Sequence, residues 1–230
     1  MTQDSTQANI NLDFEAFFAA IDDRLATLGP PGDTVAVDEL RPDIEVEFTR
    51  IFAANQPAAG DAAAARNTML TSMLLAIYRV GSRRIPNQAA LVAAIGEALV
   101  DVFTRQLASY IEGRFDVRGD RPDEAFTKIT KNFMGRGVGT FGTGFTYEED
   151  VVDDQHGFFN VTKCFFLEFF QTNGAPELTS VICRLDAIWA DEMNAGAYNV
   201  TFERPTLMSD GADKCRFQFT RTGERQDDEP

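Results

Sequence analysis

Residues 159–170 read FNVTKCFFLEFF, and this stretch contains the change of periodicity that sets the fold of the C-terminal half. Its first six residues alternate between an apolar face and a more polar face, and the polar face carries Asn160, Thr162 and Cys164. A period of two is typical of a strand, so we predict one here. The four phenylalanines that follow recur at helical spacing and predict a short helix that packs against the core.

Further strands and helices are predicted on both sides of this stretch. Downstream, helical spacing returns over residues 178–189, and two more strands are predicted at 198–205 and 214–220. Upstream, residues 135–145 read GRGVGTFGTGF, and the five glycines of this run predict a loop that interrupts any helix. The C-terminal part is therefore expected to form a small antiparallel sheet with packed helices.

The N-terminal half is expected to be helical throughout. Apolar residues recur every three to four positions in five segments, separated by Gly and Pro. The predicted helices cover residues 12–28, 38–54, 69–78 with the alanine-rich lead before it, 87–111 and 122–134. Together these patterns predict a single α+β domain over 12–220, with a helical half at 12–134 and a motif-bearing α/β part at 135–220. A flexible tail is expected at 1–11 and an acidic tail at 221–230.

Charge and composition narrow the range of partners. The chain has 230 residues, with 36 acidic against 21 basic side chains and a formal net charge of −15. Such a surface repels phosphate backbones and anionic membranes, so we expect neither nucleic acid nor a membrane as a partner. The sequence contains no apolar run of membrane-helix length and no secretory signal pattern, and its three cysteines do not indicate a disulfide framework. We expect a cytoplasmic protein that acts on a small molecule. The sequence leaves open whether the protein forms a homodimer.

The three cysteines are the first candidates for chemistry, and their C-x18-C-x31-C spacing is neither a zinc-finger nor a thioredoxin signature. Taken singly, a cysteine is more often a small buried apolar side chain than a nucleophile or a ligand. However, Glu168 follows Cys164 by one helical turn, and Asp186 follows Cys183 by three residues. Thiolates with a carboxylate could hold zinc, or a thiolate could attack an amidine carbon while a carboxylate handles protons, and the spacing does not choose.

Other motifs point away from common enzyme classes. The single histidine, His156, excludes multi-histidine metal motifs, and we expect it in an exposed turn beside acids. The glycine-rich run lacks a GK[ST] ending and follows a predicted helix, so it does not predict a phosphate-binding loop. The sequence has no G-x-S-x-G motif, so it does not predict a serine hydrolase.

Three segments, each with one of the cysteines, together carry a family resemblance. They are FNVTKCFFLEFF at 159–170, EL followed by ICRLD over 177–186, and DGADKCRFQF at 210–219. These are similar to the motifs N-V-T-[KR]-C, E-L…C-x-x-D and G-A-x-x-C-x-F-x-[FY] of the L-2-amino-thiazoline-4-carboxylate hydrolase family. The chain resembles this family over about residues 130–220. The family is itself distantly similar to small-molecule-sensing domains of the vinyl-reductase 4 type.

The resemblance implies a hydrolase that opens a small cyclic amidine, a 2-amino-thiazoline ring, to give a carbamoyl-cysteine. Water or a cysteine thiolate would attack the ring carbon. On this basis the predicted catalytic side chains are Cys164, Cys183, Cys215, Asp186 and Glu168, and the predicted substrate-binding side chains are Asn160, Thr162 and Asp210. In the alternative to a thiol role, the three cysteines hold zinc, and no other cofactor is implied. The alternative function is a non-catalytic sensor domain with a structural cysteine–zinc site.

Overall fold

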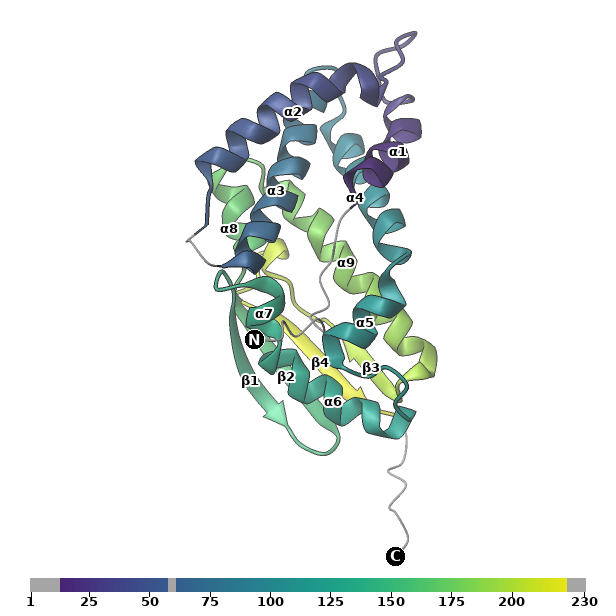
Figure 1. Cartoon of the computed structure of the whole chain (residues 1–230), viewed down its shortest axis with the longest axis vertical. Helices are drawn as coiled ribbons and strands as arrows, with labels where there is room; N and C mark the ends of the chain where they lie inside the picture. The colour runs from purple at the N-terminus through teal and green to yellow at the C-terminus, as the bar shows by residue number, and fades with distance from the viewer. Residues whose placement is uncertain (1–12, 58–60, 223–230) are drawn as a thin grey trace, which may run out of the picture. The chain divides into compact units, whose positions relative to one another are not determined.

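The computed structural model describes residues 13–57 and 61–222, so the predicted N-terminal tail and most of the predicted C-terminal tail lie outside the described residues (Figure 1). Contacts divide the described chain into two compact units. The helical unit comprises residues 13–105 and Phe165–Leu185, and the sheet unit comprises Gln106–Cys164 and 186–222. Helices dominate the N-terminal half and an antiparallel sheet lies in the C-terminal part, which confirms the predicted α+β class.

The helical unit is built from four long helices and a shorter C-terminal contribution. Its elements are α1 (Phe14–Leu25), α2 (Val37–Ala54), α3 (Ala62–Gly81), α4 (Gln88–Thr104), α8 (Phe165–Thr172), the 3-10 turn η1 (Pro176–Leu178) and the first half of α9 (Thr179–Glu192). Asp13, Asp61 and Asn87 cap α1, α3 and α4 by accepting backbone N–H groups of the first turn. These side chains satisfy donors that a helix start otherwise leaves unpaired.

An ion-pair cluster joins α2 to α3 within the helical unit. The Glu47 carboxylate accepts from Arg50 at 2.6 Å and from Arg79 at 3.1 Å. Arg79 also donates to the backbone oxygen of Asn173 at 2.7 Å, just after α8. The hydrogen bond from Arg50, assisted by Arg79, lowers the pKa of Glu47 to about 2. Glu47 therefore stays ionised and serves as a fixed structural anion.

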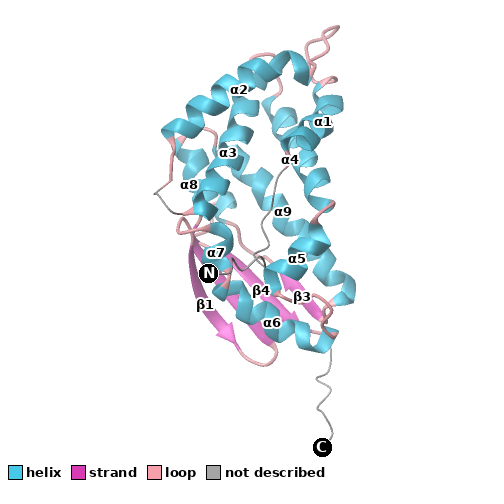
Figure 2. Cartoon of the chain, viewed as in Figure 1, coloured by secondary structure: helices cyan, strands magenta, loops and turns pink. Residues whose placement is uncertain are grey.

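The sheet unit contains four strands in the order β1-β2-β4-β3, all antiparallel (Figure 2). Val161 stands opposite Cys215 and Phe159 opposite Phe217 in the β2–β4 pair. Its elements are α5 (Leu107–Phe115), α6 (Pro122–Gly135), α7 (Gly137–Phe141), β1 (Thr146–Val152), β2 (His156–Lys163), the second half of α9, the π-helical turn η2 (Met193–Ala197), β3 (Val200–Glu203), the 3-10 turn η3 (Met208–Asp210) and β4 (Cys215–Arg221).

An aromatic core covers one face of this sheet. Phe133 of α6 stacks on Phe159 of β2 with ring centroids 4.8 Å apart, and it also meets Phe217 of β4 at 5.2 Å. Trp189 of α9 stacks on Phe202 of β3 at 4.3 Å. Such ring pairs contribute stabilising energy beyond that of the apolar area that they bury. The close packing needs a glycine at position 157, because a Cβ there would lie 2.2 Å from the Thr130 side chain.

The structure differs from the local predictions at four places. The helix predicted over 87–111 is interrupted between α4 and α5 at Arg105 and Gln106, although its apolar spacing continues across the break. The glycine run contains the one-turn helix α7. Strand β1 was not predicted, because nearly all of its side chains are exposed and its acidic sequence shows no alternation. Cys164 lies just after β2 and is not its last residue.

None of the helices in 13–57 and 61–222 has both the length and the apolarity that a membrane span requires.

Candidate functional site

The strongest candidate for chemistry is the Asp186 carboxylate, which α9 presents inside the sheet unit. Trp189, one helical turn further on, donates its indole N–H to Asp186 Oδ1 at 2.9 Å. Arg204 donates to the other oxygen, Oδ2, and forms an ion pair with it. Both carboxylate oxygens are therefore held in a defined orientation, and each by a side chain from a neighbouring turn or segment.

The Asp186 carboxylate is strongly desolvated, but part of its side chain is exposed. Burial raises the pKa of Asp186, although the Arg204 charge and the Trp189 hydrogen bond act in the opposite direction. Yet 29% of its side-chain surface is accessible, against 11% for Arg204. Protein atoms thus surround the carboxylate on most sides while part of its surface stays open to solvent. A raised pKa together with access is typical of a carboxylate that takes part in acid–base chemistry.

The segment after β3 positions Arg204. Thr206 anchors this segment to β4, because its hydroxyl donates to the Lys214 backbone oxygen at 2.9 Å and its own backbone oxygen accepts the Arg216 N–H at 3.2 Å. The Arg204 guanidinium lies over the Phe217 ring, 5.7 Å from its centroid. The planar cation is therefore supported by an aromatic face on one side and by the Asp186 carboxylate at its edge.

A second buried cation, Arg114 of α5, supports a tyrosine close to Asp186. Arg114 is 3% exposed and donates to the backbone oxygens of Asn132 and Phe133, both at 2.7 Å. It also hydrogen-bonds Tyr110. Burial raises the pKa of Tyr110 to about 12, and the negative charge of Asp186 contributes to that rise. Tyr110 consequently keeps its proton at neutral pH and can donate a hydrogen bond.

Tyr147 of β1 approaches the same region from the sheet. Burial raises the pKa of Tyr147, and Tyr110, Asp186 and Cys164 all act on it electrostatically. Its ring lies against α7, where Gly137 leaves room for it: a Cβ at that position would lie 3.1 Å from the ring. The charge of the Asp186 carboxylate thus acts on two protonated tyrosines, one from α5 and one from β1.

The thiols of the sheet unit belong to Cys164 and Cys215, and none of the three cysteines is in a disulfide. Cys215 opens β4, is buried, and its sulfur accepts the Met208 backbone N–H at 3.2 Å. Burial raises the pKa of Cys215, and Asp186 raises it further while Arg204 lowers it. Cys215 is therefore a neutral thiol near the Asp186–Arg204 pair, whereas Cys164 is half-buried after β2.

The other predicted site residues are dispersed. Cys183 lies on α9 within the helical unit, half-buried, and Glu168 is exposed on α8 of the same unit. Thr162 donates to the Glu148 side chain at 3.4 Å, and Asp210 is exposed in η3. Of the eight predicted residues, Asp186 and Asp210 act electrostatically on Cys215, and Cys164 acts on Tyr147, which Asp186 also affects.

Two predicted polar groups have particular surroundings. Asn160 of β2 is 4% exposed, and its Oδ1 accepts no hydrogen bond from the described residues. His156 is half-buried at the start of β2, where its Nδ1 lies 3.1 Å from Asp153 Oδ1. This histidine sits beside an acid, as expected, but it is half-buried as the first residue of β2 and does not lie in an exposed turn. The prediction that Asn160 binds substrate stays a prediction.

A metal site of the predicted kind needs several His, Cys, Asp or Glu side chains close together. Within 13–57 and 61–222, no three His, Cys, Asp or Glu side chains lie close enough together to hold one metal ion. Because Cys183 lies in the helical unit and the other two cysteines lie in the sheet unit, the zinc alternative stays a prediction, and we assign no chemical step to a metal.

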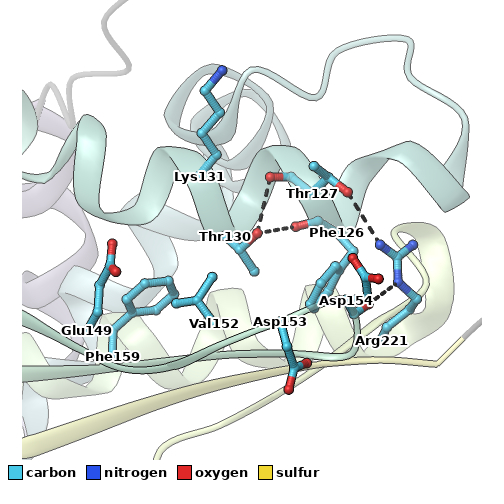
Figure 3. Close-up of a pocket in the computed structure, with 10 residues that line it drawn as sticks. All are labelled: Phe126, Thr127, Thr130, Lys131, Glu149, Val152, Asp153, Asp154, Phe159 and Arg221. Atoms are coloured by element: carbon cyan, nitrogen blue, oxygen red, sulfur yellow. Dashed lines mark hydrogen bonds between the residues drawn. The ribbon is translucent and has the colours of Figure 1, made fainter.

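A hollow of about 350 Å³ opens elsewhere in the sheet unit, between α6 and the β1–β2 turn (Figure 3). Its one arginine, Arg221, is already engaged with the Asp154 backbone oxygen at 2.9 Å and Thr127 at 3.3 Å. Lys131 and Asp153 point away from its middle in Figure 3. The charged side chains that line the hollow carry both signs and do not point to one common position. The hollow is therefore a weaker candidate for a functional site than the Asp186 region.

Sequence reasoning missed four side chains of the cluster: Tyr110, Arg114, Tyr147 and Arg204. They come from α5, β1 and the segment after β3, which are far apart in the sequence. Only Trp189 had a local signal, because it follows Asp186 by three residues on one helix and can reach back to it. The remaining four become neighbours only when the sheet forms.

Of three comparisons with known proteins, the one with protein families finds a match. A family model described as L-2-amino-thiazoline-4-carboxylic acid hydrolase matches residues 66–219, a range that contains Asp186, Arg204 and all three cysteines. No curated protein and no solved structure matches the chain. Because the match covers well over half of the sequence, the chain belongs to the L-2-amino-thiazoline-4-carboxylic acid hydrolase family.

Proposed function

We propose that this protein hydrolyses a small cyclic amidine of the 2-amino-thiazoline-4-carboxylate type, with the Asp186 carboxylate as general base. One observation carries the proposal: Asp186 is oriented at both oxygens by Trp189 and Arg204, is desolvated, and can still be reached from outside. A base whose pKa is raised above that of an ordinary carboxylate accepts a proton from water more readily. Family membership supports the substrate class.

The proposed reaction is a hydrolysis that consumes one water molecule. Asp186 takes a proton from water as the oxygen adds to the amidine carbon between sulfur and the two nitrogens. The tetrahedral adduct then collapses, the bond from that carbon to sulfur breaks, and the oxygen becomes a carbonyl. One proton of the water ends on the ring nitrogen and the other on sulfur, so the product is a carbamoyl-cysteine with a new thiol. Tyr110 and Tyr147, on both of which the charge of Asp186 acts, are the proposed hydrogen-bond donors to the reacting atoms.

Water is a better candidate nucleophile than the nearby thiol of Cys215. Only a thiolate attacks efficiently, and burial raises the pKa of Cys215, which keeps it protonated at neutral pH. In this proposal Cys164 and Cys215 form part of the wall around the reacting atoms. The proposal assigns no role in this step to Cys183 or Glu168, which lie in the helical unit.

The test is turnover of L-2-amino-thiazoline-4-carboxylate by the purified protein. The expected result is a product heavier by one water, together with one new thiol per substrate consumed. A compound that raises the melting temperature but is recovered unchanged would instead indicate a binding protein of the sensor kind. Consumption without a new thiol would contradict cleavage of the carbon–sulfur bond.

A further inference from the structure

The antiparallel sheet of the sheet unit has two unlike faces. Phe133 of α6 and Trp189 of α9 both pack on the face that carries Phe217. Because side chains alternate along a strand, the residues between the core phenylalanines point to the opposite face, which we call the outer face. The described side chains of the outer face are exposed or half-buried with one exception, Asn160; they include Glu148, Val151, His156, Phe158, Asn160, Thr162, Thr201, Glu203, Arg216, Gln218 and Thr220.

A row of three side chains crosses the outer face at right angles to the strands. Glu148 of β1 stands opposite Asn160 of β2, which in turn stands opposite Arg216 of β4. The row therefore has an anion at one end, an amide at its centre and a cation at the other end. Within the described residues, the Glu148 carboxylate accepts the Thr162 hydroxyl at 3.4 Å, and the Arg216 guanidinium forms no ion pair.

Asn160, at the centre of the row, differs from its neighbours. It is 4% exposed, although Glu148 and Arg216 on either side of it are exposed. Its Oδ1 accepts no hydrogen bond from the described residues. A buried amide oxygen without a donor costs free energy, so this position calls for a partner that the sheet itself does not supply.

We propose that the outer face is a homodimer interface, in which two copies of this chain stack their sheets face to face about a two-fold axis along β2. Rotation about this axis places β1 of each copy over β4 of the other. Glu148 of each copy then faces Arg216 of the other, and the two Asn160 amides face each other. A second copy fits because a two-fold contact presents the same patch twice, and this row is complementary to its own reverse.

The charges of the row select this axis over the other one that stacked sheets allow. An axis perpendicular to the strands would set Glu148 against Glu148 and Arg216 against Arg216, so that like charges meet. The axis along β2 keeps the strands of the two sheets aligned, as in sheets that pack about 10 Å apart. When the longer Glu148 and Arg216 side chains extend to the second copy, the two shorter amides can exchange hydrogen bonds.

The same axis brings apolar side chains together beside the row. Phe158 of one copy faces Phe158 of the other, and Val151, which is 40% exposed, stands opposite Phe158 on β1. Burial of these side chains favours association. By standard strand spacings the outer face measures roughly 20 Å by 20 Å, less than the roughly 800 Å² per partner of a standard interface. We therefore expect a reversible dimer.

The experiment measures the dimer dissociation constant of the full-length protein by sedimentation velocity. The salt concentration is about 0.15 M, which screens the repulsion between two chains of net charge −15. Arg216→Glu and Glu148→Arg each set like charges against each other twice per dimer. We expect each change to raise the dissociation constant by on the order of 100-fold. The double variant reverses the row and should restore the dimer.

The matched control is Glu149→Arg, which makes the same charge change at an exposed residue of β1 that points to the other face of the sheet. It should leave the dissociation constant unchanged. Circular dichroism checks the fold of every variant, and if a single variant misfolds, the other one and the double variant decide.

A dimer that is lost in the single variants and regained in the double variant supports the inference. A wild-type protein that stays monomeric up to its solubility limit overturns it. A dimer that persists in the single variants, or that the double variant does not restore, also overturns it. None of these outcomes bears on the proposed hydrolysis, because Arg204 and its partner Asp186 lie on the Phe217 side of the sheet.

Discussion

In the helical unit Glu47 is held by Arg50 and Arg79, and in the sheet unit Asp186 is held by Arg204 and Trp189. The pKa of Glu47 is lowered to about 2 because the hydrogen bond from Arg50 dominates. The pKa of Asp186 is raised because its desolvation outweighs its partners. An arginine beside a carboxylate therefore does not reveal the role of that carboxylate, and the balance between desolvation and pairing does. We assign a structural role to Glu47 and a chemical role to Asp186.

The largest expected effect is on turnover in Asp186→Asn. Removal of the base should lower kcat/KM by on the order of 10²- to 10⁴-fold, because the amide cannot accept the proton from water. The matched control is Asp191→Asn, which changes an exposed carboxylate further along α9 and should leave turnover unchanged. Steady-state kinetics with L-2-amino-thiazoline-4-carboxylate gives both values, and circular dichroism checks the fold. Equal losses in the two variants would contradict a special role for Asp186.

The opposite outcome is expected for Glu47→Gln, which should lose stability and keep its activity. The depressed pKa of Glu47 means that its stabilisation is present above the ordinary carboxyl pKa and is lost as pH falls towards about 2. The loss should amount to on the order of 2–3 kcal/mol in the free energy of unfolding at neutral pH. Urea unfolding at pH 7 and at low pH measures it. A variant as acid-sensitive as the wild type would show that the Glu47 cluster contributes little.

The pH dependence of stability should also differ in sign between the two carboxylates. Because the pKa of Asp186 is raised by folding, its ionised form costs stability above that pKa. The cost disappears as pH falls from that pKa to the ordinary value of 3.8. The stability difference between Asp186→Asn and wild type should therefore shrink over that window, whereas the Glu47 difference shrinks as pH falls from 4.5 towards about 2. Unfolding free energies measured across the window decide this, and the same sign for both carboxylates would remove the contrast.

The smallest expected effect is that of Cys164→Ser. If water attacks the ring carbon, this change should lower kcat by less than about tenfold, the range of a modest change in the wall of a site. Cys164→Ala serves as a second variant that removes the hydroxyl. A complete loss of turnover in both variants, with the fold intact, would identify Cys164 as the nucleophile and exclude direct attack by water.

The sequence predicts the elements of this fold better than it predicts the site. Alternation in FNVTKC and the aromatic spacing that follows identify β2 and α8, because each pattern reflects one buried face. Strand β1 has no such face: its exposed acidic side chains hide it, although it supplies Tyr147. Of the site, Asp186 could be predicted from its motif. Tyr110 and Arg204 could not, since their proximity to Asp186 depends on how α5 and β4 pack against α9.

The acid limb of the pH–rate profile tests the central claim most directly, because it reports the protonation of the base itself. We predict that kcat/KM for L-2-amino-thiazoline-4-carboxylate is lost with falling pH at a pKa above the ordinary 3.8 of an aspartate. In Trp189→Phe, which removes the hydrogen bond to Asp186 Oδ1, that limb should move to still higher pH. An acid limb at the ordinary value, or one that does not move in Trp189→Phe, would contradict Asp186 as the base.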